Sequence, residues 1–258
     1  MNLCKTDEEI ELMKLSNRLV TDVLAEIAKL IQPGITTKML DRVADEYIRS
    51  HKGIPGFLGY GGFPNTLCTS INSEVVHGIP SNIELAEGDI ISVDCGVILN
   101  GYYGDCAYTF AVGNISEDVK KLLRVTKECL FMGAEKAITG NRIGDISFAV
   151  QQHAESNGYS VVREMVGHGL GKKLHERPEV ANYGKKGSGM KLPKNLTICI
   201  EPMINMGVKG IVQEKDGWTV RTADRMPSAH FELPVAVREG SPLFLSSFQE
   251  IEAVLNIK

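Results

Sequence analysis

The feature that most constrains this chain is an internal likeness between its two halves. The segment EGDIISVD, which ends at Asp94, resembles the segment KNLTICIE, which ends at Glu201, because each is a β-branched run closed by an acid. A second acid follows each run, and both of these, Asp105 and Glu232, stand eight residues before a glycine. Two similar half-domains would therefore each deliver two carboxylates to a shared centre.

Predicted helices repeat in the same order as these acids. Apolar residues keep a helical period after a capping-box signature at Thr6, and they do so again after Ser116. Each long helix is followed by a shorter one that ends before a glycine. The predicted helices cover residues 6–32, 37–49, 116–140 and 145–156. Because strands follow each helix pair, we predict one domain over residues 1–258, with pseudo-repeat halves of about 6–113 and 115–240.

Strand alternation predicts which side chains face the shared centre. In the strand that ends the first run, Ile91 and Val93 point one way and Asp94 points the other, because successive side chains of a strand alternate. Cys95 and Cys106 each adjoin an acid and so point away from it. We expect both cysteines to be small buried hydrophobes rather than metal ligands.

A set of metal-binding side chains occurs in order along the chain: Asp94, Asp105, His168, Glu201 and Glu232. Four carboxylates in one cleft could not all stay ionised at neutral pH unless cations lay among them. Four oxygen donors with one imidazole and no thiolate suit Mn²⁺, Fe²⁺ or Co²⁺, and Zn²⁺ also fits such a set. Two such ions can share carboxylates and a water that becomes a hydroxide nucleophile near neutral pH. We therefore predict a site for two divalent ions.

Composition excludes several other classes of protein. The chain has 258 residues and a net charge of −4, so it has no global attraction for nucleic acid or an anionic membrane. The segment MNLCKTDEEI lacks the apolar core of a signal peptide, and no apolar run is long enough to span a bilayer. The six cysteines show no CxxC spacing, as expected of reduced thiols. We therefore expect a cytoplasmic protein with one sizeable core and no membrane contact.

Six motifs around these residues resemble those of one enzyme family. They are HGIP at His77, NGYYGD ending at Asp105, GHGLG around His168, HERP at His175, EPM at Glu201 and DGWTV around Trp218. In this order they are similar to the motifs of the type I methionine aminopeptidases, over nearly the whole chain. The resemblance implies an α/β fold of the pita-bread type, with an antiparallel sheet covered by helices in pseudo-two-fold related halves. It also implies a cytoplasmic, dinuclear metalloenzyme that removes the initiator methionine from new polypeptides.

The resemblance and the chemistry together suggest roles for the site residues. Glu201, a ligand able to exchange a proton with the attacking water, is the expected general acid and base. His175 would help to polarise the scissile carbonyl, and His77 would contact the substrate amide or the leaving nitrogen. A hydrogen-bonded structural role is the alternative for both histidines. The expected apolar wall of the methionine pocket consists of Tyr60, Phe63, Cys68, Leu174 and Trp218.

Leu174 departs from the commonest pattern of the family, in which a phenylalanine often precedes the histidine. Loss of that ring removes one contact to the substrate, so we expect weaker discrimination of methionine against leucine or norleucine. The expected substrates are peptides and nascent polypeptides that carry methionine followed by a small residue such as Ala, Gly, Ser or Thr. We expect the enzyme to act as a monomer.

Several further assignments rest on the resemblance or on charge. Asn72 and Ser228 match positions that help relatives to bind a monovalent cation. A basic cluster flanks Trp218 and would suit rRNA phosphates near the ribosomal exit of the nascent chain, although a solvated hairpin explains it equally well. The cluster consists of Lys209, Lys215, Arg221 and Arg225. Three histidines outside the motifs are expected at the surface or in helix packing: His51, His153 and His230.

Two other functions are compatible with the sequence. An Xaa-Pro peptidase shares the fold and a similar GHGLG segment, but such relatives carry a large additional N-terminal domain, and only 93 residues precede Asp94. A non-enzymatic relative that binds protein or RNA would lack an intact ligand set, whereas all five ligands are present here. Type II methionine aminopeptidases insert a helical subdomain between the motifs at His168 and Glu201, where this chain has no room for it.

Overall fold

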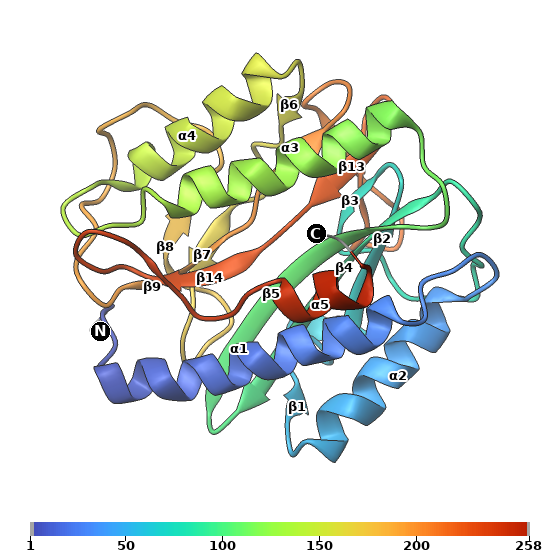
Figure 1. Cartoon of the computed structure of the whole chain (residues 1–258), viewed down its shortest axis with the longest axis horizontal. Helices are drawn as coiled ribbons and strands as arrows, with labels where there is room; N and C mark the ends of the chain where they lie inside the picture. Colours follow the sequence, from blue (N-terminus) through green and yellow to red (C-terminus); the bar gives the residue numbers. More distant parts are fainter. Residues whose placement is uncertain (1–2, 257–258) are drawn as a thin grey trace.

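Two pairs of helices cover the strands, one pair from each half of the chain (Figure 1). The helices are α1 (Asp7–Ala28), α2 (Thr37–Ser50), α3 (Glu117–Ala134), α4 (Ile143–Ser156) and α5 (Gln249–Val254), with a 3₁₀ turn at Tyr60–Gly62. The computed structural model describes residues 3–256. Within them α1 packs on α2 and on the short α5, while α3 packs on α4. In Figure 1 the two pairs run along opposite edges of the view, blue for the first and green to yellow for the second.

The two long helices begin where the sequence predicts but end earlier, and α4 begins two residues before its predicted start. The hydroxyls of Thr6 and Ser116 accept hydrogen bonds from first-turn amides, as N-cap residues do. The prediction that the third helix continues past Ala134 is wrong, because the Ile138 backbone pairs there with Arg238 and so replaces helical hydrogen bonds with tertiary ones. Helix α1 likewise ends about one turn early.

The ladders between the named strands are all antiparallel. The first sheet is built on a hairpin of β4 (Ile90–Leu99) and β5 (Tyr102–Ala111), flanked by β1 (Ile54–Pro55) and β2 (Leu67–Ile71). The second sheet contains, in spatial order, β15 (Leu243–Phe244), β14 (Leu233–Ala236), β9 (Thr197–Ile200), β7 (Gly167–Gly169) and β8 (Glu176–Val180). Two three-stranded sheets have the orders β13 (Ser228–His230), β10 (Met203–Asn205), β6 (Ser160–Val161), and β11 (Ile211–Gln213), β12 (Val220–Thr222), β3 (Glu74–Val76).

The two halves of the chain meet between β5 and the junction of β13 with β14. There the Glu232 amide donates to the Ala107 carbonyl at 2.9 Å, and the Ala107 amide donates back at 3.4 Å. Helices followed by strands therefore occur twice along the chain, and the predicted α/β class, with antiparallel strands covered by helices, is confirmed. No helix within residues 3–256 is long and apolar enough to cross a membrane.

The main hydrophobic core lies between the helices and the strands. Its centre is aromatic: the ring of Tyr108 contacts the rings of Phe110, Phe231 and Phe248, with centroids 4.8–5.0 Å apart. Burial of each such side chain stabilises the fold by about 1.5–3 kcal/mol. Cys95 and Cys106 belong to this core, which confirms that they are small buried hydrophobes. A second, smaller cluster of buried apolar residues lies at the candidate site.

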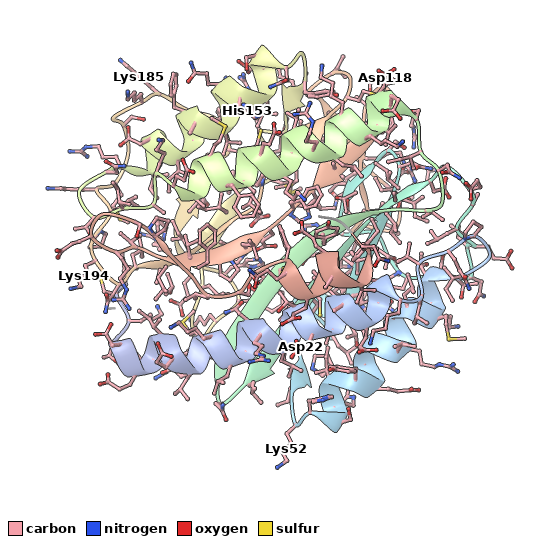
Figure 2. All side chains as sticks on the ribbon, viewed as in Figure 1. Asp22, Lys52, Asp118, His153, Lys185 and Lys194 are labelled. Carbon is pink, nitrogen blue, oxygen red and sulfur yellow. The ribbon has the colours of Figure 1, made fainter. Side chains whose placement is uncertain are left out.

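Two of the three histidines outside the motifs behave as predicted. His153 lies on α4, and its Nε2 is 2.7 Å from the Glu128 carboxylate on α3, so it helps to pack the second helix pair (Figure 2). His51 follows α2 at the surface and stacks on the ring of Tyr47. The third, His230, lies elsewhere and is described with the site.

Candidate active site

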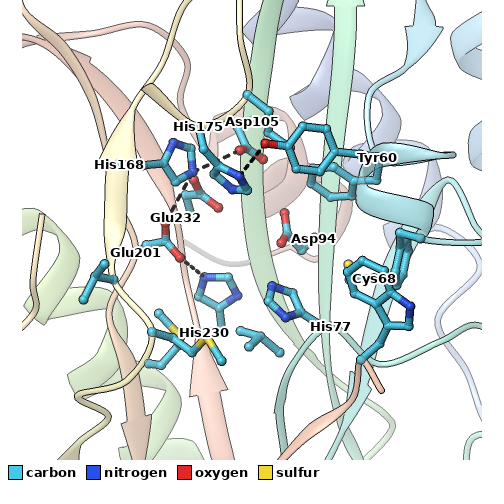
Figure 3. A pocket seen from close by; sticks show the side chains of 18 of the residues that line it. Tyr60, Cys68, His77, Asp94, Asp105, His168, His175, Glu201, His230 and Glu232 are labelled. Atoms are coloured by element: carbon cyan, nitrogen blue, oxygen red, sulfur yellow. Dashed lines mark hydrogen bonds and ion pairs between the residues drawn. The ribbon is translucent and has the colours of Figure 1, made fainter. Parts of the chain in front are cut away.

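The carboxylates of the first half lie on the long hairpin and point into a cavity (Figure 3). Asp94 on β4 pairs with Ala107, and Asp105 on β5 pairs with Gly96, so the two acids are diagonal neighbours on one face of the hairpin. The Asp105 amide also donates to the Asn17 side chain of α1 at 2.9 Å. Both acids are therefore positioned by backbone that is hydrogen-bonded on two sides.

The carboxylates of the second half lie at the ends of short strands. Glu201 directly follows β9, and Glu232 occupies the break between β13 and β14. The backbone of Glu232 is held by its two hydrogen bonds to Ala107 of β5. The Asn182 side chain donates to the Glu201 carbonyl at 3.0 Å. The structure thus brings one pair of acids from each half to the same cavity.

His168, in the middle of β7, completes the set of predicted ligands. Its Nδ1 lies 3.0 Å from the Gly169 carbonyl oxygen and can donate to it, which leaves the Nε2 lone pair for a metal. That Nε2 is 3.5 Å from Asp105 Oδ2 and 3.5 Å from Glu201 Oε1. A Cβ on Gly167 would lie 2.4 Å from the Cys199 carbonyl oxygen. Glycine is therefore required beside His168 for β7 to approach β9 this closely.

Ionisation of all four carboxylates in this cluster is strongly unfavourable when no cation is bound. Burial raises the pKa of Asp94 to about 7, and burial together with the neighbouring carboxylates raises the pKa of Asp105, Glu201 and Glu232 well above the usual range. Asp94 Oδ1, Asp105 Oδ1 and Glu232 Oε1 are buried and have no hydrogen-bond partner within residues 3–256. Among the described residues that line the cavity there is no lysine or arginine.

The geometry fits divalent metal ions. Ligand atoms of Asp105, His168 and Glu232 all lie within 4.8 Å of one another, and Cys199 offers its sulfur within the same distance. The three acids with unpartnered oxygens, Asp94, Asp105 and Glu232, all line the cavity, where a cation would satisfy these oxygens and lower the pKa values again. His168, whose pKa is lowered to about 4 mainly by burial, is neutral at pH 7 and so presents a lone pair.

Two further histidines from the motifs lie at the same cavity. The Tyr60 hydroxyl is hydrogen-bonded to His175 Nδ1 at 2.9 Å, and the His175 ring stands edge-on to His168 at 4.4 Å. His77 has a φ of +60°, which a non-glycine residue seldom adopts, and burial lowers its pKa to about 4. After it, a Cβ on Gly78 would lie 2.1 Å from the Thr69 carbonyl oxygen, so glycine is needed there.

The cavity, of about 300 Å³, has an apolar wall beside this polar floor. Its wall includes every residue predicted for the methionine pocket: Tyr60, Phe63, Cys68, Leu174 and Trp218. The rings of Phe63 and Trp218 meet edge-on at 5.1 Å. Phe63 and Leu174 are only 4 % and 2 % exposed, whereas Tyr60 is 38 % exposed and stands at the rim. The sequence did not predict other lining residues: Phe57, Val76, Glu164, Met165, Val166 and Met203.

Comparison with known proteins places this site in a family. A model of metallopeptidase family M24 matches residues 11–239. The chain belongs to this family. As an M24 metallopeptidase it is a hydrolase that uses divalent metal ions, which the carboxylate cluster is suited to hold.

Individual relatives indicate which type of M24 peptidase this chain resembles. The chain is 51% identical to a methionine aminopeptidase of Clostridium acetobutylicum, over 95% of this chain and 99% of that one. It superposes on the crystal structure of methionine aminopeptidase from Rickettsia prowazekii with a TM-score of 0.93 and 38% identity, covering 95% and 99% of the two chains. An X-Pro aminopeptidase from Thermotoga maritima shares the fold at a TM-score of 0.75 with 19% identity, covering 95% of this chain and 62% of that one. The pita-bread fold is confirmed, and the relatives favour methionine aminopeptidase over Xaa-Pro peptidase.

The prediction for His230 is wrong, because this residue lies at the cavity of the carboxylate cluster and not at the surface or in helix packing. It is 2 % exposed, lines the cavity, and places Nε2 3.9 Å from Glu201 Oε2. Burial, with a smaller effect of His77, lowers its pKa to about 3. Strand alternation could have found it, since His230 stands two residues before Glu232 and so shares its face.

The same rule would have found Cys199, which stands two residues before Glu201. Its thiol is hydrogen-bonded to the Glu232 carboxylate, and burial raises its pKa well above the usual range, so it stays a protonated donor. Cys199 and four other buried cysteines, Cys68, Cys95, Cys106 and Cys129, are free thiols. His230 and Cys199 thus each lie beside one carboxylate of the second half.

Proposed function

We propose that this chain is a methionine aminopeptidase that removes the initiator methionine from nascent proteins when the second residue is small. One observation carries the proposal: four carboxylates, two of them buried and two half-buried, and a neutral histidine line one side of a cavity of about 300 Å³ whose other side is apolar. The similarity to methionine aminopeptidases over nearly the full chain supports the same activity.

The proposed ligands of two divalent ions are Asp94, Asp105, His168, Glu201 and Glu232. Two bound ions would generate a nucleophile from water at neutral pH and polarise the scissile carbonyl. The donor set of oxygens and one imidazole favours Mn²⁺, Fe²⁺ or Co²⁺, with Zn²⁺ also suited. A monovalent cation beside Asn72 and Ser228 stays a prediction; the backbone of these two residues is joined by a hydrogen bond of 2.9 Å.

The reaction steps proposed for the protein groups are proton transfer and positioning. Glu201, with a carboxylate at the cavity floor, takes the proton of the attacking water and later returns one to the leaving amine. His175, neutral and held by Tyr60, donates a hydrogen bond to the substrate carbonyl. His77, on the same cavity, contacts the amide that becomes the leaving nitrogen. The pKa of both histidines is lowered by burial, which keeps them neutral at pH 7.

Methionine selectivity is proposed to come from the apolar wall. Burial of a methionine side chain against Phe63, Leu174 and Trp218 is worth about 1.5–3 kcal/mol, or roughly a ten- to 150-fold preference over alanine. The Leu174 side chain is buried in this wall, and with no ring at that position we propose only modest discrimination against leucine and norleucine.

Selection at the second residue is proposed to be steric. His77 and His175 line the cavity, and a substrate bound in the proposed way would place its second side chain beside them. A bulky second side chain would hold the carbonyl out of line, and a misplacement of about 1 Å can cost about a hundredfold in rate. Small second residues would therefore be preferred.

Three peptides test the proposal. With the metal-loaded enzyme, we expect methionine to be released rapidly from Met-Ala-Ser and slowly from Met-Lys-Ser, and leucine to be released hardly at all from Leu-Pro-Ala. Faster hydrolysis of Leu-Pro-Ala than of Met-Ala-Ser would replace the proposal with an Xaa-Pro peptidase. Lack of hydrolysis of all three, with metal bound, would favour a non-enzymatic relative.

The enzyme is proposed to act in the cytoplasm as a monomer. Its single catalytic domain would span residues 1–258, with repeat halves of about 6–113 and 115–240. The free thiols of the five buried cysteines support a reducing compartment. Contact with the ribosome would depend mainly on Lys209 and Lys215, because Arg221 and Arg225 both pair with Glu214, at 2.8 and 2.9 Å. Arg221 also pairs with Glu74 at 2.7 Å. Reversal of the two lysine charges should then weaken co-sedimentation with ribosomes and leave tripeptide hydrolysis unchanged.

A further inference from the structure

We propose that His230 is a positioning residue for Glu201. In this assignment the Nε2–H group of a neutral His230 donates to Glu201 Oε2, and this contact turns the other oxygen, Oε1, toward the metal site beside His168. The inference rests on the proposed function in one respect, since it takes Glu201 as a metal ligand.

The backbone of His230 is fixed independently of its ring. Its amide donates to the Thr109 hydroxyl at 2.9 Å, and that hydroxyl donates to the His230 carbonyl at 2.6 Å. On its other side, β13 places His230 opposite Met203 of β10. The ring therefore projects from a backbone held by two neighbouring strands, which limits where its nitrogens can go.

The two oxygens of Glu201 are divided between two imidazoles. Oε1 lies 3.5 Å from His168 Nε2, and Oε2 lies 3.9 Å from His230 Nε2 (Figure 3). His230 Nε2 is buried and has no hydrogen-bond partner among the described residues. A buried polar atom without a partner is unfavourable by about 1–3 kcal/mol, so a small rotation that closes this gap is favoured. Asn182 already holds the Glu201 backbone carbonyl, so His230 would fix the free end of the same residue.

A carboxylate ligand needs such a partner because its rotamer decides which oxygen meets the metal. Outer partners that orient metal ligands typically change metal affinity or activity by about 10–100-fold when removed. Glutamate has one more rotatable bond than aspartate, and Glu201 follows the end of a strand instead of lying within one. Its orientation therefore depends more on a side-chain partner than does that of Asp94 within β4.

Paired amide variants test this role. The amide nitrogen of glutamine reaches about as far along the side chain as Nε2 of histidine, whereas that of asparagine stops at the position of Nδ1. We expect His230→Asn to weaken Co²⁺ binding by about 10–100-fold and to change the visible absorption of bound Co²⁺. His230→Gln should stay within about threefold of the unmodified protein and keep its spectrum. Calorimetric titration of the metal-free full chain with Co²⁺ measures the affinities.

A matched control is available in His153→Gln, which alters another histidine that contacts a glutamate, between α3 and α4. It should leave Co²⁺ affinity and spectrum unchanged, and melting of each metal-free variant separates loss of fold from loss of orientation. Unchanged Co²⁺ affinity and spectrum in His230→Asn would overturn the assignment, as would equal losses in the Asn and Gln variants. If the unmodified protein binds Co²⁺ but releases no methionine from Met-Ala-Ser, the proposed function fails while the role of His230 stands.

Discussion

The two halves of the molecule deliver the same chemical group to the site by different means. Asp94 and Asp105 project from β4 and β5, which pair with each other along strands of 10 residues each. Glu201 and Glu232 follow strands of only 4 and 3 residues, where regular pairing stops. The first pair is thus held mainly by backbone pairing, whereas the second pair also lies beside two side chains: His230, with Nε2 3.9 Å from Glu201, and Cys199, which is hydrogen-bonded to Glu232.

This difference suggests how rigidity is distributed around the site. An aspartate side chain is short and has few rotamers. On a long, regularly paired strand, backbone hydrogen bonds are therefore enough to place its oxygens. A glutamate at a strand end has more rotamers and fewer backbone hydrogen bonds to neighbouring strands. Neighbouring side-chain donors are therefore needed to place its oxygens. Replacement of Asp94 or Asp105 should therefore remove a metal ligand. Replacement of His230 or Cys199 should leave the ligand in place but let its carboxylate adopt more orientations.

The largest effect on activity is expected when an acid of the β4–β5 hairpin is replaced. Asp105→Ala takes away a proposed ligand whose backbone is bonded to β4 and to Asn17, so the fold should survive. Metal activation contributes several kcal/mol to such reactions, and we expect a loss of at least about a thousandfold in kcat/KM on Met-Ala-Ser. Activity at the unmodified rate, after chelation and return of metal, would show that the site is misassigned.

A smaller but still large effect is expected when the spacing between strands is disturbed. In Gly167→Ala the new Cβ would lie 2.4 Å from the Cys199 carbonyl oxygen, so β7 must move away from β9 and carry His168 with it. A shift of about 1 Å should cost about a hundredfold in kcat/KM. In the control Gly210→Ala the new Cβ meets only Ala223 Cβ, at 3.6 Å, and activity should not change. Equal activities of the two variants would contradict this reading of β7.

The charge of the cluster should appear in the stability of the metal-free protein. The pKa of Asp94 is about 7 in the fold against an ordinary value of 3.8, so the folded state binds more protons between these pH values and loses stability as the pH rises through them. Asp94→Asn removes this penalty. We expect urea unfolding in the presence of a chelator to show Asp94→Asn more stable than the unmodified protein by at least about 1 kcal/mol at pH 7, and no more stable near pH 4.

Added Mn²⁺ should reverse that order at pH 7, because the unmodified protein gains stability from metal binding and the variant gains less. A stability difference that does not vary with pH in the chelated proteins would mean that Asp94 carries no raised pKa. A difference that favours the unmodified protein throughout would mean that its carboxylate has a partner other than metal.

Much of the fold could be predicted from the sequence because local signals agree with it. The caps at Thr6 and Ser116 mark the helix starts, and alternation in the run before Asp94 predicts its strand. The end of α3 could not be predicted in this way. The residues after Ala134 keep a helical pattern, but the Ile138 backbone pairs with Arg238, about a hundred residues later in the chain, and local periodicity carries no information on such pairing.

The site was predictable where residues belong to motifs and less so where they act through a neighbour. Motifs led to the proposed ligands and the apolar wall. His230 and Cys199 are in no motif, and a lone histidine or cysteine is more often structural than functional. Only their spacing of two residues from Glu232 and Glu201 indicated a shared strand face, and that signal becomes informative once both acids are placed in one cavity.

The smallest effect is expected from the thiol partner of the second half. Cys199 donates to the Glu232 carboxylate, and a thiol is a weaker donor than an imidazole or a hydroxyl. Removal of this contact in Cys199→Ala should therefore lower Co²⁺ affinity by about two- to tenfold, the equivalent of about 0.5–1.5 kcal/mol, which is less than the loss expected for His230→Asn. Cys199→Ser retains a donor and should bind Co²⁺ within about twofold of the unmodified protein. If Cys199→Ala instead lost as much affinity as Asp105→Ala, the sulfur would have to be counted as a sixth metal ligand, and the contrast between the carboxylates of the two halves would have to include this soft donor in the second half.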